Sequence, residues 1–385
     1  MKLAVKGKRI VTAPGKEPEA GVMVVENGKI IAIGRDVESP SGAKLLDIGD
    51  HFLYPGFIDA SSHLGINKEP FDYMVEIWDG CDTSSPFQPE LRVTDGFNPF
   101  SSAITKARSV GITTAYAAAG HGMLMDGQGI VFKLVETEEA KDMFLPGTEQ
   151  LHFCIGDYPL MGSQQAHRPP LTRMALMRML RGELRRAQGI LERKEAAPDE
   201  KTEILLRALK REIKVRIYVL AAQDIPLAVE LGEEFGLDYI LDGLYEAWKL
   251  PRFWKKHPQA VLLNGVLCGP MQNTLATKYE ISMDNFSVLD QAGCEIVLTA
   301  DGVTTTRLLP YIAGYAIGAG LPEEKALAAI TTLPAKLLGL ADRVGTLEVG
   351  KDADFTIYDG NALLSTSRCL ATYINGEAVF MEIDE

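Results

Sequence analysis

Histidine is the side chain best suited to bind a metal ion or to move a proton at neutral pH. The chain has six of them: His51, His63, His121, His152, His167 and His257. Two stand where a strand is expected, because His63 follows the apolar residues 56–60 and His152 lies within the apolar residues 151–155. These two histidines are therefore the first candidates for a site that several side chains must share.

A serine stands two positions before His63. Residues 57–63 alternate as a strand does, so Ser61 and His63 should face the same side of it. A hydrogen bond between the two fits this geometry, but the sequence names no third group that would orient them as a nucleophile and its base. The chain also has no G-x-S-x-G segment and no P-loop.

The segments that must position these residues alternate between strand and helix. Strands are expected at residues 56–60, 113–117, 130–134, 151–155, 215–220, 239–241, 260–263 and 295–299. Helices are expected between several of them, at residues 101–109, 225–235 and 286–291. This α/β alternation predicts a parallel sheet with crossover helices, and its length favours a closed (β/α)8 TIM-like barrel. His63 should then lie at the C-terminal mouth of the barrel.

Both ends of the chain have a different pattern, typical of short strands joined by turns. Residues 21–25 and 30–34 flank an Asn27-Gly28 turn, and residues 353–358 and 372–379 repeat this style. We therefore predict a composite β-sandwich domain from residues 1–53 and 342–385. The barrel takes residues 54–341, with a helical insertion near residues 172–213.

Composition limits the partners of the protein. A net charge of −13 argues against a nucleic-acid partner, and no apolar run approaches the roughly 18 residues that cross a membrane. The five cysteines are scattered, as reduced thiols are in the cytoplasm. We expect a cytoplasmic protein that binds a small-molecule ligand or substrate, and a homo-oligomer remains open.

Several segments carry a family resemblance. Residues 53–63 read LYPGFIDASSH, residues 345–355 read GTLEVGKDADF, and residues 332–340 read TLPAKLLGL. They resemble the amidohydrolase superfamily, and shorter matches at residues 95–99, 127–129 and 171–174 are similar to its imidazolonepropionase-related branch. The resemblance implies a barrel beside a composite β domain. It also implies hydrolysis of C–N bonds by one or two divalent metals at the barrel mouth.

The resemblance further implies metal ligands that this chain mostly lacks. The family pattern has a His-x-His pair on the first strand, a histidine on each of the fifth and sixth strands, and an aspartate on the eighth. Of the pair only His63 remains. The positions that carry other residues are Ser61, Tyr218 or Leu220, Gly243 and Ala300. Asp301 follows Ala300 directly, so on a regular strand it would face the opposite side, but a small loop adjustment at the strand's end would bring it in.

Three residues with oxygen or nitrogen ligand atoms remain for a metal site that has fewer ligands than the family pattern: His63, His152 and Asp301. Three such ligands with one open position form the pattern of a catalytic zinc centre, in which Asp301 is also the candidate catalytic residue. Lys133 is a candidate bridging lysine in carbamylated form. The predicted pocket residues are Ser61, His63, Lys133, Tyr218, Gly243 and Asp301. For the cofactor we expect none, or a weakly bound divalent metal such as zinc.

Two functions stay open. The first is a hydrolase of non-peptide C–N bonds, of the cyclic amide or acyl-amino-acid type, whose metal-dependent activity is reduced or lost. The second is a non-catalytic relative that binds a small molecule or serves as an assembly subunit. The intact scaffold favours the first and the substituted ligand positions favour the second.

Overall fold

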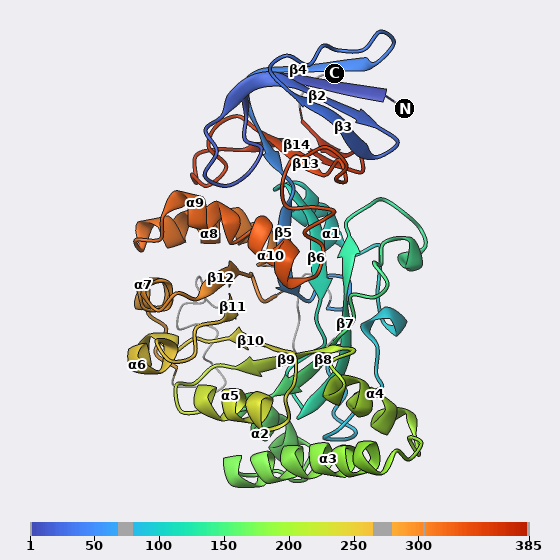
Figure 1. The fold of residues 1–385 in the computed structure, drawn as a ribbon, viewed down its shortest axis with the longest axis vertical. Coiled ribbons are helices and arrows are strands. Elements are labelled where there is room, and N and C mark those ends of the chain that lie inside the picture. The colour runs from blue at the N-terminus through green and yellow to red at the C-terminus, as the bar shows by residue number, and fades with distance from the viewer. Residues whose placement is uncertain (1, 68–79, 265–278, 303–304, 383–385) are drawn as a thin grey trace.

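The computed structural model describes residues 2–67, 80–264, 279–302 and 305–382, and its strands form two sheets. The first sheet holds both ends of the chain, and Figure 1 shows the two termini beside it. Its strands, in spatial order, are β15 (Glu377–Met381), β14 (Cys369–Ile374), β13 (Phe355–Tyr358), β4 (Lys44–Pro55), β1 (Lys2–Ile10), β2 (Glu19–Glu26) and β3 (Lys29–Gly34). β13 and β4 pair antiparallel and so join the two ends of the chain. The limits of the predicted domains remain predictions.

The turn between β2 and β3 explains why this hairpin forms. Asn27 and Gly28 both have positive φ, 50° and 76°, which the tightest hairpin turns require and which these two residue types tolerate best. The predicted Asn-Gly hairpin is therefore confirmed.

The second sheet is the nearly closed barrel. Its strands are β5 (Phe57–Ser62), β6 (Ile112–Ala117), β7 (Met125–Lys133), β8 (Gln150–Cys154), β9 (Lys214–Val219), β10 (Tyr239–Gly243), β11 (Ala260–Leu263) and β12 (Glu295–Leu298). Each overlaps one of the strands expected from the sequence. The backbone N–H of Asp301, just beyond β12, donates to the carbonyl of Ser61 on β5 at 3.3 Å and draws the two edges together.

The prediction of a fully parallel sheet is wrong at one strand. β7 runs antiparallel to both of its neighbours, β6 and β8, while the remaining neighbours are parallel. Residues 118–124 join β6 to β7, which suits an antiparallel connection, because a parallel crossover needs about a dozen residues or more.

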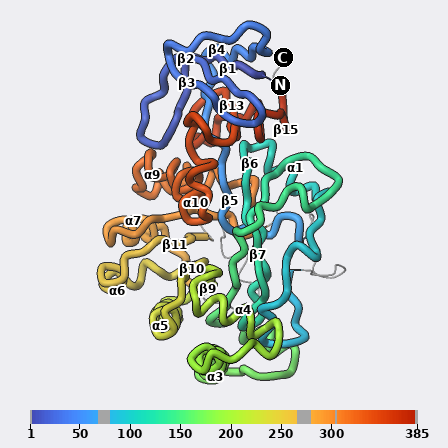
Figure 2. The backbone as a smooth tube through the Cα atoms, turned by 45° about the vertical axis from the view of Figure 1, so that its right-hand side comes forward, coloured from blue at the N-terminus to red at the C-terminus, as the bar shows by residue number. Residues whose placement is uncertain are grey.

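Helices follow most of the barrel strands other than β6 and β7. They are α1 (Ser102–Arg108), α2 (Asp157–Gln165), α3 (Arg173–Arg193), α4 (Glu200–Leu209), α5 (Ile225–Glu234), α6 (Pro251–Trp254), α7 (Asp284–Gln291), α8 (Leu309–Gly318), α9 (Glu323–Ala328) and α10 (Thr332–Leu337). Short 3₁₀ helices lie at η1 (Val93–Asp95), η2 (Ala140–Asp142), η3 (Ala247–Lys249) and η5 (Thr306–Leu308). Thr172 caps the N-terminus of α3, and Asp199 caps that of α4. In each case the side-chain oxygen of the cap accepts a hydrogen bond from a backbone N–H of the first turn. Figure 2 shows α3 at the end of the molecule far from the terminal sheet.

The interior of the barrel is packed rather than hollow. Ile58, Tyr116, Ile240 and Leu262 belong to one buried cluster inside it, and Ala335 of α10 joins this cluster. A polar site must therefore lie toward the mouth of the barrel. Among the residues that the structure describes, no helix is both long and apolar enough to cross a membrane.

Candidate functional site

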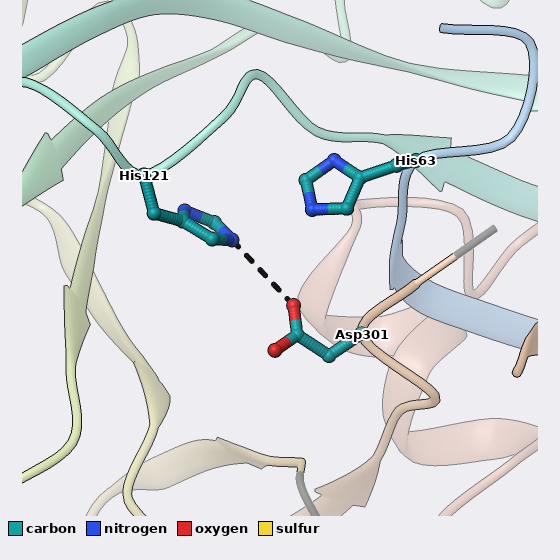
Figure 3. A group of neighbouring side chains, drawn as sticks. All are labelled: His63, His121 and Asp301. Atoms are coloured by element: carbon teal, nitrogen blue, oxygen red, sulfur yellow. Dashed lines mark ion pairs between the residues drawn. The ribbon is translucent and has the colours of Figure 1, made fainter. Parts of the chain in front are cut away.

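Three side chains from three parts of the chain converge at the barrel mouth. His63 follows the end of β5, His121 lies in the loop after β6, and Asp301 follows β12. One ligand atom from each lies within 4.8 Å of the other two, and Figure 3 shows the three side chains pointing toward one another. These strands end at the same edge of the barrel, the edge that carries active sites in this architecture. We call these three residues the His-His-Asp group.

Asp301 joins the group from just beyond the end of β12, where the backbone conformation changes. Its φ is +46°, in the left-handed region, which aspartate adopts more readily than most residues. Val297 belongs to the buried cluster inside the barrel, whereas Leu298 and Ala300 belong to a different buried cluster. By the alternation of a strand, Asp301 shares the side of Val297 and not that of Ala300. The inner side at this strand end is therefore that of Asp301, one residue after the position that the family pattern indicated.

His63 presents a lone pair to the group. Its Nδ1 lies 3.1 Å from the carbonyl oxygen of Ala118, which can only accept, so Nδ1 carries the hydrogen. In the neutral ring Nε2 is then free to act as a ligand. Burial lowers the pKa of His63, which keeps the ring neutral.

His121 and Asp301 each direct an atom that lacks a hydrogen-bond partner into the group. His121 Nε2 lies 3.5 Å from Asp301 Oδ1, and both atoms are buried and otherwise unpaired. Burial lowers the pKa of His121 to about 4 and raises that of Asp301 to about 6, so at neutral pH the contact joins a neutral imidazole to a carboxylate. Two neutral imidazoles and one carboxylate are the donors that a divalent metal such as zinc prefers. The residues present therefore fit one metal ion.

Tyr218 contacts this group without belonging to it. Its Oη donates to Asp301 Oδ2 at 3.1 Å, and its ring stacks on the ring of His121. Burial raises the pKa of Tyr218 well above its ordinary value, so the side chain remains a neutral phenol and a donor.

A second polar cluster lies beside the group, around Asp242 of β10. Ser61 Oγ donates to Asp242 Oδ2 at 2.8 Å, and Arg216 Nη1 donates to the same oxygen at 3.0 Å. Asn264 donates to Asp242 Oδ1 at 3.1 Å. Arg216 is fully buried and also donates to the side chain of Gln150. Ser61, a predicted pocket residue, thus belongs to a hydrogen-bonded ion-pair cluster.

Gly243, another predicted pocket residue, leaves no room for a ligand. Its φ is +105°, and a Cβ there would lie 2.5 Å from the side chain of Leu220. A histidine at this position would need both a strained backbone and a shift of its neighbours.

The structure does not bring His152 into the group. Its Nε2 lies 2.9 Å from Tyr116 Oη, and its ring stacks on the ring of Tyr116. His152 pairs with Arg216 across β8 and β9, two residues before the level of Cys154 and Tyr218. Burial and the charge of Arg216 lower its pKa well below the ordinary value. The structure therefore places His121, and not the predicted His152, beside His63 and Asp301.

Lys133 lies at the other end of the barrel, so the prediction of a bridging lysine is wrong. Because β7 is antiparallel, its last residue lies beside Thr114 near the start of β6. Lys133 Nζ contacts Asp352 at 2.7 Å and Asp354 at 2.9 Å, and it donates to Asn375 Oδ1 at 2.6 Å. The lysine joins the barrel to the terminal sheet.

His121 is the member of the His-His-Asp group that the sequence did not indicate. It comes four residues after a predicted strand, in a loop between Gly120 and Gly122. That position at the carboxyl end of a strand is a usable signal, but loop residues carry no periodicity that would indicate where a side chain points.

Comparisons with known proteins agree with this architecture. A model of the amidohydrolase family described as Amidohydro_3 matches residues 299–380. Amidohydrolase tasK of Hapsidospora irregularis is 22% identical over 94% of this chain, which spans 40% of that relative's length. An imidazolonepropionase of Fusobacterium nucleatum is 21% identical over 94% of this chain and 91% of its own. A solved amidohydrolase from Thermotoga maritima superposes over 99% of this chain with a TM-score of 0.90 and 28% identity. Together these similarities support the assignment of the chain to the amidohydrolase superfamily and its relation to imidazolonepropionase.

Proposed function

We propose that this chain is a hydrolase of non-peptide C–N bonds that uses one divalent metal ion, most simply zinc, held by the His-His-Asp group. The observation that carries the proposal is the pair of buried atoms without hydrogen bonds, His121 Nε2 and Asp301 Oδ1, directed at one another beside His63. Leaving such atoms unpaired costs stability, and a metal ion would satisfy both at once. Two histidines and a carboxylate with an open position match a catalytic zinc centre.

The residues of this chain would each have a defined task. A divalent metal bound there would lower the pKa of a coordinated water and would polarise the scissile carbonyl. Burial keeps His63 and His121 neutral and therefore able to donate lone pairs. Asp301 contributes the negative charge, and its second oxygen is fixed by Tyr218.

The substrate class that we propose is a cyclic amide or an N-acyl amino acid. The imidazolonepropionase relatives, matched along most of the chain, support a cyclic amide. The packed barrel interior supports a small substrate bound at the mouth.

A panel of lactams and N-acyl amino acids tests the proposal. Wild-type protein with added zinc should hydrolyse at least one of them, and His121→Ala should lower that rate about 100-fold or more because one ligand is lost. His257→Ala, which changes a histidine outside the barrel mouth that pairs with Glu233, is the matched control and should keep the rate. Protein that holds zinc yet turns over nothing on the panel would contradict the catalytic proposal.

A non-catalytic binder is the second candidate, and one observation favours it. Ser61 stands where the family pattern has a ligand, and here it is committed to Asp242 and Arg216. Small molecules that raise the melting temperature of zinc-loaded protein and are never hydrolysed would support this candidate.

A further inference from the structure

Tyr218 contacts two of the three members of the His-His-Asp group. Its ring lies flat on the ring of His121, with centroids 3.6 Å apart and planes 3° from parallel. Its Oη donates to Asp301 Oδ2 at 3.1 Å, and this leaves Oδ1 directed at His121. One rigid side chain therefore sets the plane of an imidazole and the rotation of a carboxylate.

The surroundings of Tyr218 hold it in this position. The side chain is buried, with 3% of its surface exposed, and Tyr158 packs edge-on against it at 5.9 Å and 82°. Gly243 lies on the neighbouring strand, where a Cβ would sit 3.5 Å from the Tyr218 ring and 2.5 Å from Leu220. A side chain at Gly243 would thus clash with Leu220, which packs beside Tyr218, and would only touch the Tyr218 ring.

His121 has a second contact, at its Nδ1 atom. Cys154, which pairs with Tyr218 across β8 and β9, places its Sγ 4.0 Å from His121 Nδ1 and donates to Asp126 at 3.1 Å. His121 lies in a loop, so its orientation is not fixed by strand hydrogen bonds. The contacts with Tyr218 and Cys154 fix it instead.

We propose that Tyr218 is a positioning residue, which aligns His121 and Asp301 for a metal ion instead of ligating the ion itself. Tyr218 is one of two positions, with Leu220, at which the family resemblance implies a histidine ligand. In this chain that strand then contributes to the site through the stack and the hydrogen bond. The inference rests on the proposed metal site. It adds that His121, from a loop, takes the place of the family's strand histidine because Tyr218 holds it in position.

Two substitutions separate the two contacts. Tyr218→Phe keeps the ring and removes the hydrogen bond to Asp301, whereas Tyr218→Leu removes both. Partners that orient metal ligands are worth about 10- to 100-fold in metal affinity. Competition with a chromophoric chelator should therefore show zinc binding weakened about tenfold in Tyr218→Phe and about 100-fold in Tyr218→Leu. Tyr311→Phe, on the half-exposed face of α8, is the matched control and should bind zinc as the wild type does.

A structural role alone would not change the coordination of the metal. The visible spectrum of the cobalt-substituted protein should therefore shift in Tyr218→Phe, while the melting temperature without metal stays near that of the wild type. Equal zinc affinities and identical cobalt spectra in wild type, Tyr218→Phe and Tyr218→Leu would overturn the positioning role, while the proposed metal site would still hold.

Failure of the metal site itself has a different signature. In that case the wild type would take up no zinc, which overturns the proposed function. The ring-proton resonance of His121 in the metal-free protein then decides the positioning claim. It should lie upfield in wild type and Tyr218→Phe and return to its ordinary shift in Tyr218→Leu, and an unchanged shift in Tyr218→Leu would overturn it.

Discussion

Asp242 and Asp301 are neighbouring buried carboxylates with different surroundings. Asp242 accepts hydrogen bonds on both oxygens, from Ser61 and Arg216 on one and from Asn264 on the other. Asp301 accepts from Tyr218 on Oδ2 and has no partner on Oδ1. Only Asp301 therefore retains a free acceptor for a ligand, while Asp242 neutralises a buried arginine.

Removal of Arg216 should strongly destabilise the protein. Arg216→Met would leave Asp242 buried without its cation, and breaking a buried pair costs about 3–5 kcal/mol. Urea denaturation should show this loss. The double variant Arg216→Met with Asp242→Asn should recover part of it, because no unpaired charge remains. A single variant within about 1 kcal/mol of wild type would contradict this account of the barrel interior.

At the scale of elements, the direction of β7 decides what its residues can do. The antiparallel course places Met125 near the barrel mouth and Lys133 at the opposite end, where it meets Asp352 and Asp354. Lys133 is thus part of the contact between barrel and terminal sheet and not of the site.

Lys133→Met should accordingly separate stability from metal binding. The change leaves two buried carboxylates without their shared cation, so the free energy of unfolding should fall by about 3 kcal/mol or more. Zinc affinity should stay within about twofold of wild type, since the lysine lies outside the His-His-Asp group. The opposite pattern, lost metal binding with intact stability, is what a carbamylated bridging lysine would give.

The positions of the barrel strands could be predicted from the sequence because buried strands are short apolar runs. The direction of β7 could not. Polar and glycine residues from Asp126 to Gly129 interrupt its apolar pattern, so the expected strand began only at residue 130. The connection from residue 117 then looked long enough for a parallel crossover. His121 was not named as a ligand for a related reason, because a loop position leaves no periodic signal. Asp301 was predicted as a ligand, but its positive φ was not.

At the scale of the whole molecule, ion pairs connect the barrel to the sheet that both chain ends form. Asp352 contacts Lys133, Lys29 and Arg343. Burial alone would raise the pKa of Asp352, but these cations, Lys133 foremost, hold it at about 2, below the ordinary 3.8. Asp354 contacts the same lysine, but its deeper burial raises its pKa.

The depressed pKa of Asp352 predicts a loss of stability in acid. A carboxyl with a lower pKa in the folded state stabilises the protein above about pH 4, and this contribution disappears as the pH falls toward 2. Asp354 acts in the opposite sense, so Asp352→Asn must be compared with wild type over the same range. The stability difference between the two proteins should shrink from pH 5 to pH 2. A difference that stays constant would contradict the ionic role of Asp352.

The zinc content of the purified protein tests the central claim most directly. After dialysis against zinc and removal of the free ion, elemental analysis should find close to one zinc per chain in wild type and in His152→Gln. The same analysis should find well under half an equivalent in His121→Ala, and chelation should lower the melting temperatures of wild type and His152→Gln but not that of His121→Ala. Wild-type protein without zinc, or His121→Ala with a full equivalent, would contradict a metal site built from His63, His121 and Asp301.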